Sequence, residues 1–577
     1  RNLEDREIEA EGTLFSHINI KENIYTHLIP LFRDLDADYN GLLFKKHFSE
    51  DLIVDDKVIK ELIKNMCYPL SPYQFDEIEP EILGRIYEKF LGSKIRLTDG
   101  HQAKVEEKPE VRHAGGVFYT PQYIVDYIVK NTLGEVINNV SPDEIKKIRV
   151  CDPACGSGSF LLGAFEYLMQ YHLNYYSSAP VSIQKKYKED FYYTADKEIK
   201  LSLKKRSEIL QNNIFGVDID REATEVAIMS LYLKLLDDGF DKGQVELFMK
   251  GHILPDMTGN IKCGNSLISR DSLYENDMFG DNDINPFDWK NEYNAIFIEG
   301  GFDVILGNPP YIKTQEMQKY QPKAVEIFKN TYSSASKGNF DIYILFIEKA
   351  SSLVKEGGKI GYICPHKFFN SGYGENIRNI LSNNKLLHKI LHFGVNQIFK
   401  NATTYTCLLF LNKESNNSFN FYEYKQEVST IEEDVTNDNI PYFSIASEKV
   451  SSDNWTFMNA ESNDKMEKIC NGKPLLEELV TNIFQGPKAG ADPVFILKCI
   501  KKTENGIMAY SNSLDMNIEI ETSLLHPYRK GKNIKKNHII TSDEYIVFPY
   551  TSDGTLVEIK EIEHKYPLTY SYLVNPI

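Results

Sequence analysis

Short apolar runs alternate with helical patterns between about residues 111 and 415, and this alternation limits the chain to few folds. The runs that predict buried strands are residues 148–152, 214–218, 302–307, 359–363 and 404–411. Helical patterns follow at residues 222–236 and 341–354. Strands that alternate with helices form a mostly parallel sheet covered on both faces. The pattern predicts an α/β domain with a doubly wound, Rossmann-like sheet.

The regions on either side predict two further domains. Residues 1 to about 110 place apolar and charged side chains at helical spacing, which predicts a helical connector domain. From about 416 to 577, short strands and turns predict an α+β domain, which we expect to be truncated at its C-terminus. At 577 residues the chain is long enough for several domains. The acidic, polar stretch 271–299 predicts a surface insertion.

A glycine loop follows the first predicted strand of the α/β domain. Asp152 ends this strand, and Gly156-Ser157-Gly158 precedes a helix. The loop lacks the third glycine of the dinucleotide fingerprint. Asp218 ends the next strand, where a carboxylate can accept hydrogen bonds from ribose hydroxyls. An adenosine ligand with an amino-acid tail would fit such a loop without needing room for a pyrophosphate.

A rigid tetrapeptide, Asn308-Pro309-Pro310-Tyr311, follows the strand predicted at 302–307. Two prolines fix φ and carry no backbone donors, so the loop continues neither a strand nor a helix. The Asn308 side chain and the Pro309 carbonyl can accept hydrogen bonds from an NH2 group, and Tyr311 offers a ring for a planar heterocycle. A proline-rich turn beside a core tyrosine is the alternative.

Together these motifs resemble those of a known family. Asp152-Pro153-Ala154-Cys155-Gly156-Ser157-Gly158-Ser159-Phe160 and Asn308-Pro309-Pro310-Tyr311 are similar to the S-adenosylmethionine (AdoMet) loop and the catalytic loop of adenine-N6 DNA methyltransferases. Gly116–Pro121 resembles the segment that closes over the cofactor's methionine end, and the order of motifs is that of the gamma class. Segments 79–92, 341–349 and 484–486 look most like fused Type IIG restriction-modification enzymes of the Eco57I kind. The resemblance covers about residues 70–577.

The resemblance implies AdoMet as the cofactor and no metal. It implies that the cofactor-binding residues are Tyr119, Thr120, Asp152, Ala154, Gly156, Gly158, Asp218, Ile219, Asn265 and Ser266. Asn265 stands where the family usually has an acidic residue near the adenine amino group, although an amide can still accept a hydrogen bond. Phe160 and Ile219 either pack against that adenine or belong to the core. The implied catalytic residues are Asn308, Pro309, Pro310 and Tyr311, with the Tyr311 ring stacked on a flipped adenine.

The implied partner is double-stranded DNA, although a formal net charge of −18 does not favour phosphate contacts overall. A local basic surface can coexist with acidic domains. The resemblance implies that the C-terminal α+β domain, residues 416–577, is the target-recognition domain. The candidate DNA-binding residues lie there, in a stretch free of acidic residues: Arg529, Lys530, Lys532, Lys535 and Lys536. A solvated face is the alternative for this run.

Two other functions stay open. A protein glutamine N5-methyltransferase can use the same catalytic loop, and a non-catalytic DNA-recognition subunit can retain AdoMet binding. We expect any nuclease domain or subunit to lie outside this chain, because Asp55-Asp56-Lys57 lacks partners and is more typical of a helix start. The sequence has no signal peptide, and no apolar run approaches the ~20 residues that span a bilayer. Its eight cysteines show no paired metal spacing. We therefore expect a cytoplasmic prokaryotic protein without a membrane segment.

Overall fold

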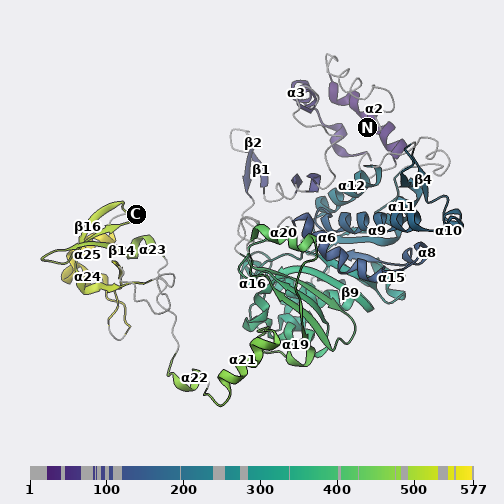
Figure 1. Cartoon of the computed structure of the whole chain (residues 1–577). Coiled ribbons are helices and arrows are strands. Elements are labelled where there is room, and N and C mark those ends of the chain that lie inside the picture. Colours follow the sequence, from purple (N-terminus) through teal and green to yellow (C-terminus); the bar gives the residue numbers. More distant parts are fainter. Residues whose placement is uncertain are drawn as a thin grey trace. The chain divides into compact units, whose positions relative to one another are not determined.

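The chain folds into two compact units, Arg1–Lys465 and Met466–Ile577, in a computed structural model (Figure 1). The structure describes residues 23–39, 46–66, 82–84, 86–87, 93–97, 103–107, 120–194, 196–237, 254–272, 284–336, 338–399, 404–426, 428–474, 476–482, 491–529, 543–551 and 554–574. Among these residues, no helix is both long and apolar enough to cross a lipid bilayer.

A nine-stranded sheet in the order β13-β12-β10-β11-β9-β8-β3-β6-β7 forms the centre of the first unit. Its strands are β3 (Val150–Asp152), β6 (Ile214–Asp218), β7 (Ile261–Cys263), β8 (Phe302–Gly307), β9 (Val354–Pro365), β10 (Leu387–His392), β11 (Thr406–Asn412), β12 (Ser418–Glu423) and β13 (Phe443–Ala446). β7, β6, β3, β8 and β9 are parallel neighbours, whereas β11 runs antiparallel to both β9 and β10. The predicted α/β, doubly wound fold is confirmed, with a mixed sheet.

Helices cover the central strands of this sheet. The main ones are α6 (Gln122–Lys130), α9 (Ser159–Ser178), α11 (Leu203–Asn213), α12 (Arg221–Asp237), α16 (Thr314–Tyr320), α17 (Pro322–Thr331), α18 (Tyr343–Leu353) and α19 (Glu375–Asn383). α9 packs on β3 and β6, and α18 packs on β8 and β9. Every residue of β8 is buried, which explains why its sequence is an apolar run without the alternation of a half-exposed strand.

The strand order reverses next to β3. The chain passes from β3 to β6 and β7 on one side, and then returns to form β8 on the other side. In open α/β sheets, ligands bind at this switch point, beyond the carboxyl ends of the strands. Asp152, Asp218 and Asn308 end or follow β3, β6 and β8, so the fold brings them to one edge.

The predicted boundary near residue 416 lies too early. β12 pairs in parallel with β10, and β13 pairs with β12, so this part of the chain extends the main sheet. The first compact unit therefore continues to Lys465. The apolar alternation at the sheet edge resembles that of a separate small β-rich domain, and only long-range pairing distinguishes the two.

The sequence pattern predicts an N-terminal region that is helical throughout, but the structure contains strands there as well. α2 (Ile24–Tyr39) and α3 (Asp56–Met66) are helices, but β1 (Ser93–Leu97) and β2 (Ala103–Glu107) form an antiparallel pair. Polar and apolar residues alternate in the sequence 94–97, as is typical of a strand. The helical spacing of the residues before them hides this short pattern.

Asp55 and Asp56 act at helix starts. Both carboxylate oxygens of Asp56 accept backbone N–H groups, from Asn23 at 2.9 Å and Ile24 at 2.8 Å. Asp55 Oδ1 accepts the N–H of Lys57 at 2.8 Å. These contacts agree with the structural interpretation of this patch.

The stretch 271–299 is only partly a surface insertion. Of its residues, 273–283 lie outside the described part of the chain. Phe287, Trp289 and Tyr293 are buried and pack edge to face on one another or on Phe302 of β8. Three aromatic side chains spaced through a polar sequence thus anchor its second half in the core.

The second unit has an α+β fold, as predicted. Its five antiparallel strands follow the order β16-β15-β14-β18-β17. They are β14 (Ile496–Lys502), β15 (Ile507–Ser511), β16 (Met516–Ile520), β17 (Leu525–Pro527) and β18 (Glu544–Val547), accompanied by α23 (Asp492–Phe495), α24 (Ile559–Lys565) and α25 (Pro567–Val574). Tyr572 of α25 packs into the core of this sheet and donates to the carbonyl of Val494 at 2.7 Å.

Candidate functional site

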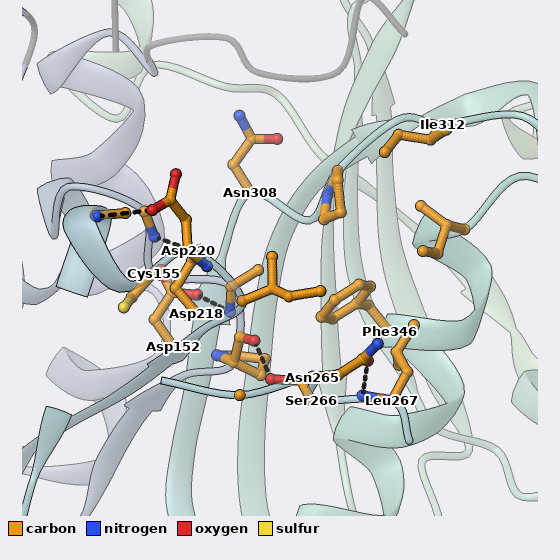
Figure 2. Close-up of a pocket in the computed structure, with 18 of the residues that line it drawn as sticks. Asp152, Cys155, Asp218, Asp220, Asn265, Ser266, Leu267, Asn308, Ile312 and Phe346 are labelled. Carbon is orange, nitrogen blue, oxygen red and sulfur yellow. Dashed lines mark hydrogen bonds between the residues drawn. The ribbon is translucent and has the colours of Figure 1, made fainter. Parts of the chain in front are cut away.

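A cavity of about 390 Å³ lies beyond the carboxyl ends of β3, β6, β7 and β8 (Figure 2). Its volume is within the range of small-molecule sites. Ten of the predicted residues line it: Thr120, Asp152, Ala154, Gly156, Asp218, Ile219, Asn265, Ser266, Asn308 and Pro310. The structure therefore brings both predicted motifs, the glycine loop and the proline loop, to one site.

The glycine loop is held by the neighbouring strand. Gly156 and Gly158 have φ values of 51° and 92°, which other residues rarely adopt. The N–H of Gly156 donates to Asp218 Oδ2 at 2.8 Å. The loop leads directly into α9, whose first turn directs backbone N–H groups toward the loop side of the helix. Gly158 itself does not line the cavity; its role is to make the turn close to Ala227.

Two carboxylates face the cavity from adjacent strands. Asp152 Oδ1 accepts the N–H of Ala154 at 2.9 Å, and Asp218 Oδ1 accepts the N–H of Asp220 at 2.9 Å. Burial raises the pKa of Asp152 to about 8 and the pKa of Asp218 to about 6, against the lowering effect of these hydrogen bonds. A ligand that carries positive charge or hydroxyl donors would favour the ionised form of both groups.

The sign of the lining charge selects between ligands. Asp152, Asp218 and Asp220 line the cavity, and no lysine or arginine does so among the residues that the structure describes. A pyrophosphate would be repelled here, whereas a sulfonium or an ammonium group would be attracted. In the described part of the chain, no group of three or more His, Cys, Asp or Glu side chains is arranged to hold a metal ion.

The proline loop forms another wall of the cavity. Asn308 Nδ2 donates to Thr120 Oγ1 at 3.1 Å, which fixes the rotation of the amide. Gly307, at φ 151°, lies directly against Asp152: a Cβ there would be 2.5 Å from Asp152 Oδ1. The proline loop, which carries Asn308, and the end of β3, which carries Asp152, are thus in direct contact.

Tyr311 does not lie where a stacking role requires. Its side chain is 8% exposed and does not line the cavity. The ring packs edge to face on Tyr343 and Phe399, and the hydroxyl donates to the carbonyl of Ile363 at 3.1 Å. A phenol whose hydroxyl is bonded inside the core is stable there, so this ring supports the loop from beneath. The predicted stacking on a base does not fit this position.

The other predicted residues are placed as follows. Asn265 lines the cavity, but its Oδ1 accepts the N–H of Leu267 at 3.1 Å, so the acceptor expected to replace an acidic residue is engaged in a turn. Ser266 Oγ donates to the carbonyl of Pro153 at 2.5 Å and ties this turn to the glycine loop. Pro309 is buried and does not line the cavity. Outside the described residues lie Tyr119, Lys530, Lys532, Lys535, Lys536 and the segment 484–486, whereas Arg529 is exposed.

Part of the cavity wall could not be found from motifs. Ile312 and residues of α16, α17 and α18 supply an apolar side, with Met317, Phe328 and Phe346. Phe160 and Ile219 also line the cavity; Phe160 is buried and Ile219 is 51% exposed. Apolar helical residues look like ordinary core in a sequence, and only the packing of three helices shows that they line a cavity.

Replacing Gly307 by alanine is expected to disturb both loops. The new Cβ must displace Asp152 or the Asn308 backbone, and a φ of 151° adds strain of about 1–3 kcal/mol. We expect a loss of stability in urea unfolding that is larger than the loss in a control variant without this contact. Gly300→Ala is the matched control, because φ there is also positive (101°) but the nearest atom is 3.7 Å away. An equal loss of stability in both variants would contradict the loop contact.

The chain is similar in sequence to the methylases of restriction-modification systems. The family model for the Eco57I restriction-modification methylase matches residues 212–399, which include Asp218 and the proline loop. The chain thus carries a methylase domain of the Eco57I family.

Similarity extends over the whole chain. It is 33% identical to the type II restriction enzyme and methyltransferase RM.Eco57I of Escherichia coli, covering 99% of this chain and 56% of that protein. It is 22% identical to the adenine-specific methyltransferase PglX of Lacticaseibacillus casei (strain Zhang), over 60% of this chain and 32% of that protein. The chain therefore spans about half the length of RM.Eco57I and about a third of the length of PglX.

One solved structure supports the fold. The Type IIL restriction-modification enzyme MmeI, determined in complex with DNA, superposes with a TM-score of 0.52 at 14% identity. The superposition covers 97% of this chain and 67% of that chain.

Proposed function

We propose that this chain transfers a methyl group from AdoMet to the N6 amino group of an adenine in double-stranded DNA. The observation that carries the proposal is one cavity lined by Asn308, Asp152 and Asp218 and free of basic side chains among the described residues. AdoMet combines an adenosine with two cationic groups, a sulfonium and an ammonium. Few other common cofactors would benefit from three carboxylates.

Three groups of residues would hold the cofactor. The Asp218 carboxylate would accept hydrogen bonds from the ribose hydroxyls, and Asp152 would face the cationic tail. Thr120 and the first N–H groups of α9 would receive the cofactor's carboxylate. Ile219, Phe160 and the apolar wall of α16–α18 would enclose the adenine ring.

The proline loop would activate the acceptor. An adenine amino group is a weak nucleophile because its lone pair is delocalised into the ring. When the Asn308 side chain accepts an N–H bond of this amine, the nitrogen can become pyramidal and expose the lone pair. The Pro309 carbonyl, the second acceptor that the resemblance implies, belongs to a residue that does not line the cavity. Bound AdoMet supplies a methyl group already activated by the sulfonium. The residues would therefore act by positioning. As the new C–N bond forms, the bond between the methyl group and sulfur would break, its electron pair would return to the sulfur of the departing S-adenosylhomocysteine, and the amine would lose one proton to solvent.

Three observations support the proposal that the substrate is an adenine in DNA. The relatives are a restriction enzyme and methyltransferase and an adenine-specific methyltransferase. The proline loop fits a planar NH2 group, and the C-terminal α+β unit is a separate fold that could read a DNA sequence. The target base must leave the duplex to reach the cavity, which costs a few kcal/mol.

Labelled AdoMet offered with mixed-sequence DNA tests the proposal. We expect label in DNA, and we expect mapping to place the modification on adenine N6. Label in protein would support a glutamine methyltransferase instead. AdoMet binding without any transfer would support a non-catalytic recognition subunit, and label on cytosine would overturn the adenine assignment.

Neutralising the basic run Arg529–Lys536 is expected to weaken DNA binding and to flatten its salt dependence. Removing one lysine–phosphate interaction should reduce the slope of log K against log salt by about 0.9. Fluorescence anisotropy with a DNA duplex at several salt concentrations would measure both quantities. Lys535→Gln/Lys536→Gln is best compared with Lys185→Gln/Lys188→Gln, a pair of exposed lysines in the first unit. The same slope in both double variants would assign the run to a solvated face.

A further inference from the structure

A short segment of the N-terminal region lies directly on the glycine loop. Residues 82–84 and 86–87 are helical, and Gly84 is buried. A Cβ at Gly84 would lie 2.9 Å from Ser157 Oγ and 3.2 Å from Ser157 Cβ. Because Ser157 sits between Gly156 and Gly158, nothing larger than hydrogen fits between this segment and the loop that forms the cavity wall.

Three residues later, the same segment reaches the other side of the cavity. Tyr87 Oη donates to Asp220 Oδ2 at 3.3 Å, and Asp220 lines the cavity. The second oxygen of Asp220 accepts the N–H of Glu222 at 2.9 Å, at the start of α12. Burial, and the negative charges of Asp220, Glu222 and Asp218, raise the pKa of Tyr87, so its hydroxyl stays protonated and able to donate.

Asp220 is linked in turn to the proposed ribose acceptor. Its backbone N–H donates to Asp218 Oδ1 at 2.9 Å, while the N–H of Gly156 donates to Asp218 Oδ2. The segment 82–87 therefore contacts both elements that fix the Asp218 carboxylate: Gly84 touches the glycine loop, and Tyr87 holds the turn at Asp220. The sequence analysis named the segment 79–92 for its resemblance to Type IIG enzymes and did not connect it with the cofactor cavity.

We propose that Tyr87 is a positioning residue for the donor cavity, and that residues 82–87 couple the N-terminal region to cofactor occupancy. The inference rests on the proposed function in that the ligand is AdoMet. Tyr87 and Gly84 hold the cavity wall in the shape that binds the cofactor. By linkage, a bound cofactor must hold segment 82–87 more firmly in place.

The variant Tyr87→Phe tests the positioning role. It removes one hydroxyl, and we expect the Kd and KM for AdoMet to rise roughly three- to tenfold, the range for one ordinary hydrogen bond. The kcat at saturating AdoMet should stay within about twofold of the wild type, because the acceptor loop is untouched. Tyr171→Phe is the matched control, since Tyr171 donates to the carbonyl of Val140 and does not line the cavity. An unchanged Kd in Tyr87→Phe, or an equal change in both variants, would overturn the role.

A second pair of variants addresses the glycine contact. Gly84→Ala is expected to weaken AdoMet binding in the same direction, because the methyl group would push on Ser157. Gly259→Ala is the control, since no atom lies within 4 Å of its Cβ position. If Gly84→Ala binds AdoMet as tightly as Gly259→Ala does, the packing of Gly84 on the glycine loop does not shape the cavity.

Hydrogen exchange tests the coupling itself. In the wild-type protein, saturating AdoMet should slow amide exchange in the peptide that contains residues 82–87, and this protection should shrink in Tyr87→Phe but persist in Tyr171→Phe. A wild-type protein that binds AdoMet without protecting this peptide would refute the coupling and leave the proposed function intact. A wild-type protein that binds no AdoMet would instead refute the proposed function.

Discussion

Replacing Asn308 by alanine is expected to slow methyl transfer by at least about 100-fold while AdoMet binding stays within about twofold of the wild type. Removing one preorganised polar group from a reacting centre typically costs 10²–10³ in kcat. Asn308 would grip the acceptor amine, whereas the carboxylates that would hold the cofactor come from β3 and β6. Single-turnover transfer to DNA, measured beside calorimetric binding of AdoMet, separates the two effects.

Asn308→Asp provides an informative comparison. Aspartate keeps an acceptor for the amine but loses the Nδ2 donor that bonds to Thr120, so we expect intermediate activity. Asn379→Ala, at an exposed position of α19, controls for the loss of an amide elsewhere in the chain. Two outcomes would refute the assignment: full transfer activity in Asn308→Ala, or a loss of AdoMet binding as large as the loss of transfer.

The parts of the site that the sequence predicts are those fixed by the backbone of single loops. Asp152, Asp218 and Asn308 mark the ends of apolar runs, and parallel strands necessarily bring such ends to one edge of a sheet. The glycines and prolines between them restrict φ locally. For this reason the positions of both loops follow from short segments of sequence, without any knowledge of long-range packing.

What the sequence does not reveal depends on contacts between distant segments. Tyr311 follows the proline loop in the sequence, yet its ring turns into the core because Ile363, some fifty residues later, offers a carbonyl to its hydroxyl. Phe328 and Phe346 form a cavity wall only once α17 and α18 pack together. Tyr87 meets Asp220 across 133 positions of sequence. Nothing local in these residues distinguishes a core side chain from a ligand contact.

The domain boundary illustrates the same limit. Residues 418–423 and 443–446 have the pattern of short strands in a small β-rich domain, but the first pairs with β10 and the second with β12, so that both extend the main sheet. The pattern of a strand shows which of its side chains face the core, but it does not identify the strand with which it pairs. A boundary placed by a change of pattern is therefore displaced whenever a sheet continues past its last crossover helix.

Replacing Asp218 by asparagine is expected to weaken AdoMet binding by roughly 10- to 100-fold, because hydrogen bonds to a charged acceptor contribute about 1.5–3 kcal/mol each. In the wild type, the backbone N–H groups of Gly156 and Asp220 donate to the two oxygens of the Asp218 carboxylate. In the asparagine variant, one of these two donors would face the NH2 group of the amide instead of an oxygen. Calorimetry at a single pH near 7.5 would measure the loss. A variant that binds as tightly as the wild type would remove Asp218 from the cofactor site.

The dependence of this binding on pH gives a sharper test of the same carboxylate. Burial raises the pKa of Asp218 from 3.8 to about 6 in the unliganded protein, and hydrogen bonds from ribose hydroxyls would stabilise the ionised form. Through Asp218, binding should therefore weaken as the pH falls below about 6, by up to about tenfold per pH unit, with uptake of a proton when AdoMet dissociates. In Asp218→Asn the step near pH 6 should vanish. Asp152, whose pKa lies near 8, and the α-amino group of AdoMet titrate at higher pH, and the carboxyl group of AdoMet titrates at lower pH, so none of them produces that step. A step that persists unchanged in Asp218→Asn would assign the titration to another group.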